Sequence, residues 1–227
     1  AEISQNMFRM LLEEGMGFTT DPYSASGISG LDTLCCKKHL VMIEKWPSRS
    51  MPNDEGYFSI AEIPIGYEGG SGLFVPKHTI DAFPLATAFN AYKYLPEYAN
   101  IFRKGYTTPC MDATKDKGVG CQEGNYVCND EKWPNTTCAV TGRYVPPQCE
   151  ADPSQCQEIY MANPNWDMGF FEGLIKNTGL KFIMVYLGYT GHINRVVADN
   201  AAKNNFMFYW WEPDPLVSLV GAEAVAF

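Results

Sequence analysis

Three of the five tryptophans stand where a predicted strand ends or a helix begins. Trp46 follows a buried apolar run, Trp211 ends another, and a turn with proline comes directly after each. Trp166 lies in a loop that opens a predicted helix. Ligands of α/β proteins bind outside the carboxyl ends of strands, and the face of an indole ring attracts cations. We therefore predict that these three rings form an aromatic cage for a quaternary ammonium group, which has no N–H to donate.

The other two tryptophans favour a packing role. Trp210 alternates with Trp211 along one strand, so its side chain should point to the opposite face. Trp133 lies in a cysteine-rich segment and is expected to pack locally. A single tryptophan at a strand end is also typical of core packing, so the cage depends on the three occurring together.

The elements that position these rings alternate between short apolar runs and helical patterns. Extended or strand segments are expected at 39–43, 60–65, 73–75, 182–186 and 206–211, and helices at 2–15, 31–37, 82–94, 98–104, 169–177 and 193–204. Short buried strands alternating with helices predict an α/β protein with parallel sheets.

The cysteines are concentrated in one segment, roughly 107–157, that is rich in Gly, Pro, Asn and Asp. Neither C-x-x-C pairs nor interleaved histidines occur there, which disfavours a zinc site. A disulfide-stapled insertion is the better interpretation, and no metal or cofactor is expected. The six cysteines concerned are Cys110, Cys121, Cys128, Cys138, Cys149 and Cys156. Asn135 begins a glycosylation sequon within the segment, which favours a secreted glycoprotein.

Charge and residue types also limit the function. The formal net charge is −9 and the isoelectric point is near 4.8, which argues against a nucleic-acid partner. The three histidines are scattered, so they do not suggest a catalytic triad. Glu44 and Glu212 could form a paired-carboxylate site beside the tryptophans, but a role in polarising the rim of the binding site is favoured. We therefore expect a protein that is not an enzyme.

The start of the sequence given does not have the pattern of a signal peptide. Residues 2–15 begin directly in a helical pattern, and the chain ends on Phe227 without a turn signal. We expect a mature or excised piece of a longer polypeptide.

Five segments, in the correct order, resemble a known family: residues 2–18, 41–47 (VMIEKWP), 66–76 (GYEGGSGLFVP), 163–177 (NPNWDMGFFEGLIKN) and 208–213 (FYWWEP). Together they resemble the substrate-binding proteins of glycine betaine/proline betaine transporters, which have the type II periplasmic binding-protein fold. The resemblance runs from near residue 1 to about 217 and is interrupted by the cysteine-rich insertion.

The resemblance implies two lobes and a set of ligand contacts. Lobe I would comprise 1–65 plus 212–227, without the family's first strand, and lobe II would comprise 66–211, with the insertion at about 107–157. The resemblance implies the same cage trio of Trp46, Trp166 and Trp211. It also places the ligand's carboxylate near Ser71 and Gly72, where a Gly-rich turn could present N–H groups as an anion nest.

One departure bears on the ligand. Asp214 follows Pro213 where the family carries no acid. An acidic side chain there would repel a carboxylate, which leaves choline, or a zwitterion other than glycine betaine, open as the ligand.

The expected function is capture of a small quaternary-ammonium or betaine-like solute by an extracellular or periplasmic domain. Its partner would be a membrane transporter or receptor module, in the same polypeptide or complex, and the domain could be membrane-tethered through segments outside this chain. The alternative is a degenerate binding fold that serves as a receptor ectodomain or as a structural or interaction subunit of a secreted assembly.

Overall fold

The computed structural model describes residues 2–21, 69–105, 143–162, 166 and 169–227. The chain divides into two compact units, Ala1–Tyr67 and Glu68–Phe227. In the first unit, helix α1 (Glu2–Met10) continues into the wider helix η1 (Leu11–Gly15), which confirms the helix expected over 2–15. The expected elements at 31–37, 39–43 and 60–65 lie outside the described residues.

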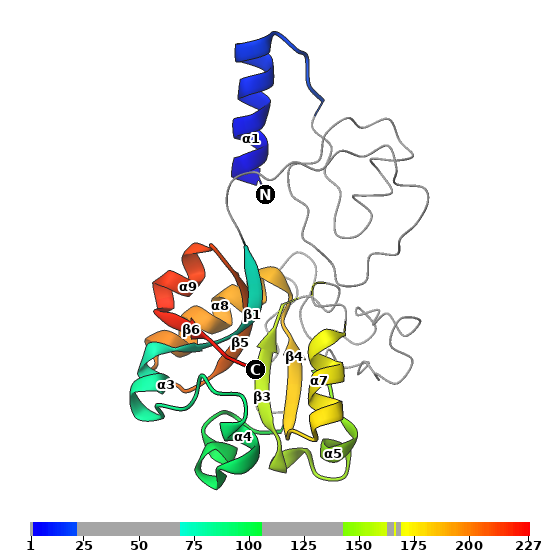
Figure 1. Ribbon diagram of the computed structural model, residues 1–227, viewed down its shortest axis with the longest axis vertical. Helices are drawn as coiled ribbons and strands as arrows, with labels where there is room; N and C mark the ends of the chain where they lie inside the picture. The colour runs from blue at the N-terminus through cyan, green and yellow to red at the C-terminus, as the bar shows by residue number, and fades with distance from the viewer. Residues whose placement is uncertain (1, 22–68, 106–142, 163–165, 167–168) are drawn as a thin grey trace. The chain divides into compact units, whose positions relative to one another are not determined.

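The second unit is built on one six-stranded sheet with the strand order β2-β4-β3-β5-β1-β6 (Figure 1). The strands are β1 (Gly70–Pro76), β2 (Arg143–Tyr144), β3 (Gln157–Met161), β4 (Phe182–Tyr186), β5 (Met207–Glu212) and β6 (Ala222–Ala224). Strand β3 runs parallel to β4 and β5, whereas β1 is antiparallel to β5 and β6, and β2 is antiparallel to β4. The α/β class is confirmed, but the sheet is mixed rather than parallel.

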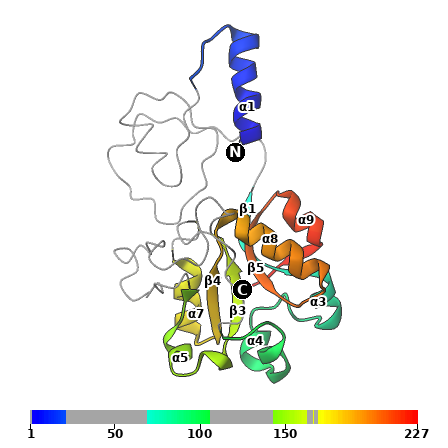
Figure 2. The same cartoon turned by 180° about the vertical axis from the view of Figure 1, so that it is seen from behind.

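Helices and turns cover both faces of this sheet (Figures 1 and 2). They are α3 (Lys77–Ala82), α4 (Ala91–Tyr94), η3 (Pro96–Asn100), α5 (Pro147–Glu150), η4 (Pro153–Gln155), α7 (Phe170–Thr178), α8 (Gly188–Ala201) and α9 (Pro215–Val220). Successive side chains along the strands point to opposite faces of the sheet and pack into two separate cores. Met207 and Tyr209 of β5 pack with α4 and α7, and Phe208 and Trp210 pack with α8 and α9.

The helix expected over 82–94 is wrong for most of its length. Residues 83–90 form turns, and only Ala91–Tyr94 is helical. Pro84 supplies the reason, because proline disfavours helical geometry at the residue before it and lacks a backbone N–H. Phe83 has φ −135° and ψ 83°. The helix expected over 98–104 is likewise only the short turn η3.

Strand β3 was not expected, because it begins in the segment assigned to the insertion. All five of its residues are buried, including the polar Gln157 and Glu158. Gln157 is satisfied in the core: its side-chain oxygen accepts the Phe102 N–H at 2.8 Å, and its amide donates to the Tyr98 carbonyl at 2.9 Å. Hydrogen bonding of this kind allows a polar residue in a central strand.

One disulfide, between two of the six cysteines of the predicted framework, lies among the described residues. Cys149 and Cys156 are joined, and both are fully buried between α5 and the start of β3. The other four cysteines of the predicted framework, Cys110, Cys121, Cys128 and Cys138, lie outside the described residues, as does Asn135.

The C-terminal segment packs with the second unit. Strand β6 pairs with β1 through Phe74 and Ala224, and α9 packs against the same core as α8. Residues 212–227, expected in lobe I, therefore fall in the unit that contains 68–211.

Candidate functional site

Four chain segments meet at one edge of the sheet. The parallel strands β3, β4 and β5 end there, at Met161, Tyr186 and Glu212. Strand β1 is antiparallel to β5, so its first residues begin at the same edge. The ladder continues past the strand ends, because the N–H groups of Leu187 and Gly188 donate to the carbonyls of Met161 and Ala162, both at 2.9 Å.

Aromatic rings gather at this edge. Trp166 follows β3, Tyr189 follows β4, and Trp211 lies near the end of β5. The centroid of the Trp166 ring lies 5.2 Å from that of Trp211 and 6.1 Å from that of Tyr189, with interplanar angles of 79° and 67°. The rings of Tyr189 and Trp211 are nearly parallel, at 21°. The structure thus brings together two of the three predicted cage residues; Trp46 lies outside the described residues.

Tyr189 is a member of this cluster that the sequence analysis missed. It is 52% exposed, whereas Trp166 is 37% exposed. Its position near the carboxyl end of a buried strand is the signal that singled out the tryptophans, and applying that rule to tyrosine would have found it.

Trp210 lies beneath the exposed rings, contrary to the expectation that it points away from Trp211. The two indoles stack at 4.1 Å with an interplanar angle of 16°. Trp210 is fully buried, as expected of a packing residue. Trp211 is paired with Ser71 in the β1–β5 ladder, yet its ring folds back onto the neighbouring indole.

His192, from the second turn of α8, stacks on Trp210 at 4.8 Å and 10°. It is fully buried, and burial lowers its pKa to about 3, partly opposed by the hydrogen bond to the Tyr160 carbonyl. Its Nε2 lies 3.3 Å from that carbonyl oxygen. Its Nδ1 and the Nε1 of Trp210 are buried without a hydrogen-bond partner.

The Gly-rich segment next to these rings is a strand rather than the expected turn. Ser71 pairs with Trp211 and Gly72 with Trp210 along the β1–β5 ladder. An anion nest needs a turn conformation, so the extended backbone at Ser71 and Gly72 does not form one. The register nevertheless places both residues beside the tryptophans.

The acidic residues of this edge differ in role. Asp214 begins α9, and its Oδ1 accepts the Leu216 N–H at 2.8 Å. This capping role accounts for the acidic residue after Pro213, so no ligand contact is needed to explain it. Glu212 is exposed and directly follows Trp211, so its carboxylate adds negative potential beside the rings.

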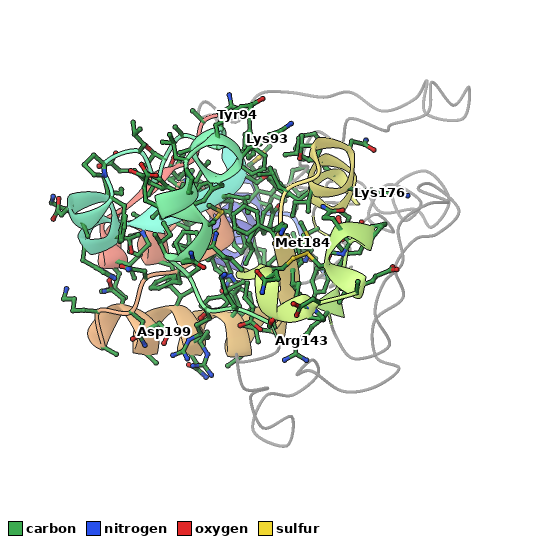
Figure 3. The ribbon with its side chains drawn as sticks, turned by 90° about the horizontal axis from the view of Figure 1, so that it is seen from below. Lys93, Tyr94, Arg143, Lys176, Met184 and Asp199 are labelled. Atoms are coloured by element: carbon green, nitrogen blue, oxygen red, sulfur yellow. A yellow bond between two sulfur atoms is a disulfide. The ribbon has the colours of Figure 1, made fainter. Side chains whose placement is uncertain are left out.

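A buried polar network fixes α8 and with it Tyr189 and His192. Asp199 accepts the Tyr160 O–H at 2.7 Å and the Asn204 amide at 2.8 Å. Arg103 lies 3.3 Å and Arg195 3.8 Å from its Oδ1. Figure 3 shows Asp199 on α8, on the opposite side of the unit from Tyr94 on α4.

Helix α7, which follows Trp166 along the chain, is also anchored to the sheet. Tyr186 of β4 donates its O–H to the buried carboxylate of Glu172 on this helix. The helix ends at Gly179, whose φ of 70° suits glycine. Trp166 therefore lies in the chain between strand β3 and helix α7, and α7 is anchored to the sheet.

Within the described ranges, no group of three or more His, Cys, Asp or Glu residues is placed to hold a metal ion. None of the helices described there is long and apolar enough to cross a membrane. In comparisons with known proteins, no family model and no curated protein matches the chain.

Proposed function

We propose that this chain captures a small quaternary-ammonium or betaine-like solute between aromatic rings. The observation that carries the proposal is the group formed by Trp166, Tyr189 and Trp211 where three parallel strands end. Three large rings that remain partly solvent-exposed while contacting one another are typical of a surface that binds a ligand, and cation–π attraction suits such rings to a quaternary ammonium group.

Electrostatics supports a cation over an anion. The chain carries a net charge of −9, and the exposed Glu212 lies next to Trp211. Because Trp166 stands roughly perpendicular to its neighbours and contacts them, a cation enters by displacing the Trp166 ring from the other two. Trp46, the third predicted cage residue, lies outside the described residues.

In this proposal the chain is a solute-binding domain of the two-lobed type II periplasmic binding-protein kind, with a disulfide-rich insertion at about 107–157. It acts outside the cytoplasm and delivers its ligand to a membrane transporter or receptor module. The resemblance of five ordered sequence segments to betaine-binding proteins supports this assignment.

The test is a titration followed by tryptophan fluorescence and by calorimetry. Choline, glycine betaine and dimethylsulfoniopropionate are compared with 3,3-dimethylbutanol, in which a carbon replaces the quaternary nitrogen of choline. We expect saturable binding of charged ligands and at least about tenfold weaker binding of the neutral analogue, because only a cation gains cation–π attraction.

Trp211→Ala should weaken binding by about 1–2 kcal/mol or more. Folded protein that responds to none of the charged compounds would refute the proposal and favour the degenerate fold with a structural or interaction role. Equal affinity for choline and its neutral analogue would refute the cation site.

A further inference from the structure

Two polar atoms are buried without partners directly behind the candidate cage. The indole Nε1 of Trp210 and the imidazole Nδ1 of His192 have no hydrogen-bond partner, and both residues are fully buried. Natural proteins satisfy nearly all buried polar atoms, so each of these two atoms needs an explanation. The two rings are stacked on each other, at 4.8 Å, and Trp210 is also stacked on Trp211.

The protonation of His192 follows from its other nitrogen. Nε2 faces the Tyr160 carbonyl oxygen at 3.3 Å. A carbonyl oxygen only accepts hydrogen bonds, so Nε2 carries the proton. The ring is neutral near pH 7 because burial lowers its pKa to about 3. In a neutral imidazole with the proton on Nε2, Nδ1 is an acceptor.

The buried pair therefore offers one donor and one acceptor. The indole N–H of Trp210 only donates, and Nδ1 of His192 only accepts. A hydroxyl group matches both, since it donates one proton and accepts with its lone pairs. A carboxylate has acceptors alone, so it would satisfy Trp210 but place its oxygen against the lone pair of His192.

Other groups at this edge also disfavour a carboxylate. The N–H groups of Leu187 and Gly188 at the start of α8 already donate to carbonyls that follow β3. Ser71 and Gly72 are extended and form no anion nest. Glu212 is exposed beside Trp211 and would repel an anion.

We infer that the polar group of the captured ligand is a hydroxyl, which accepts from Trp210 Nε1–H and donates to His192 Nδ1. The preferred ligand class is a hydroxylated quaternary ammonium compound such as choline, rather than a betaine. The inference rests on the proposed function, because the exposed rings of Trp166 and Tyr189 must part around the ammonium group before the hydroxyl reaches the buried pair.

Calorimetry with a matched ligand pair tests the inference. Ethyltrimethylammonium differs from choline only by lacking the hydroxyl, and glycine betaine replaces the hydroxyl arm with a carboxylate. We expect choline to bind about tenfold more tightly than ethyltrimethylammonium, as expected for two hydrogen bonds to buried groups. Glycine betaine should bind no more tightly than ethyltrimethylammonium.

Two variants test whether Trp210 and His192 cause the preference for choline over ethyltrimethylammonium. Trp210→Phe keeps a buried ring without the N–H, and His192→Phe keeps a ring without the acceptor. Each should bring the ratio of choline to ethyltrimethylammonium affinity close to one, whereas Tyr94→Ala on α4 should preserve the wild-type ratio. If His192→Phe does not fold, Trp210→Phe alone decides.

Equal affinities for choline and ethyltrimethylammonium in the wild type would overturn the inference, as would tightest binding of glycine betaine. An unchanged ratio in Trp210→Phe would also overturn it. In each of these outcomes a quaternary ammonium still binds, so the proposed function stands. If none of the three compounds binds, the proposed function fails and the inference fails with it.

Discussion

Trp210 and Trp211 are consecutive residues of β5, yet their indole rings stack with centroids 4.1 Å apart. Side chains of consecutive strand residues normally point to opposite faces. The stacking buries one face of Trp211 against a fully buried neighbour, and His192 stacks on Trp210 in turn. Trp211 is therefore held by a rigid aromatic base, so its ring is positioned before any ligand arrives.

Tyr189 should contribute to binding through its ring rather than its hydroxyl. Its ring lies 6.1 Å from that of Trp166 and 6.5 Å from that of Trp211. Tyr189→Ala should weaken binding of a quaternary ammonium by about 0.5–2 kcal/mol, and Tyr189→Phe should retain most of the affinity. Calorimetric titration of choline into each variant measures both effects.

Tyr94 provides the matched control. It is an exposed tyrosine on α4, with Lys93 5.5 Å from its ring centroid, and Figure 3 shows it on the opposite side of the unit from Asp199. Tyr94→Ala should bind choline as the wild type does. An equal loss of affinity in Tyr94→Ala and Tyr189→Ala would remove Tyr189 from the site.

Part of this fold is predictable from local patterns. The apolar runs at 182–186 and 206–211 correspond to β4 and β5, because uninterrupted β-branched and aromatic residues suit a strand that is buried on both faces. Strand β3 escaped prediction because its sequence, QEIYM, begins with two polar residues, and the side chain of Gln157 is satisfied by partners distant in sequence. Pairing with β1 and β6, which makes the sheet mixed, likewise depends on tertiary contacts.

The candidate site was likewise predictable only where local sequence patterns determine it. The rule that ligands bind beyond strand ends correctly selected Trp166 and Trp211 as neighbours, since it depends only on strand order and direction. The rule did not predict the stacking of Trp211 on Trp210, because the side chains of these two residues do not alternate between faces of the sheet. The extended backbone at Ser71 and Gly72 was missed because glycine content suggests a turn, whereas pairing with β5 determines the conformation.

Asp199 should be important for stability. It is 2% exposed, and it accepts hydrogen bonds from Tyr160 and Asn204 while lying near two arginines. Asp199→Asn should lower the free energy of unfolding by about 2–3 kcal/mol, because it removes the charge that compensates Arg103 and Arg195 in a partly buried setting. Urea unfolding followed by circular dichroism measures the loss.

Asp81→Asn is the control for that substitution. Asp81 pairs with Lys77 at 2.5 Å, but both side chains are well exposed. Solvent screens such a pair, so its removal should leave the unfolding midpoint unchanged. A similar loss in both variants would mean that burial of the Asp199 network adds nothing.

The disulfide between Cys149 and Cys156 should stabilise the second unit modestly. It closes a short loop, with a sequence separation of 7, and a short loop restricts the unfolded chain less than a long one. Replacing both cysteines with alanine should lower the free energy of unfolding by about 2 kcal/mol. Chemical unfolding of the double variant without reductant measures this, and unchanged stability would contradict it.

His192 should make stability depend on pH in a defined window. Burial lowers its folded-state pKa from 6.5 to about 3, so the unfolded chain binds a proton that the folded chain does not over this range. Its contribution is therefore fully present above the unfolded pKa and is lost as pH falls toward the folded pKa.

Linkage predicts a loss of about 2 kcal/mol between about pH 7.5 and about pH 5. Urea unfolding at both pH values measures this decrease in the free energy of unfolding of the wild type. In His192→Phe the decrease should be smaller by about 2 kcal/mol. An equal pH dependence in the two proteins would mean that His192 takes up its proton in the folded state as readily as in the unfolded chain, which would contradict the lowered pKa.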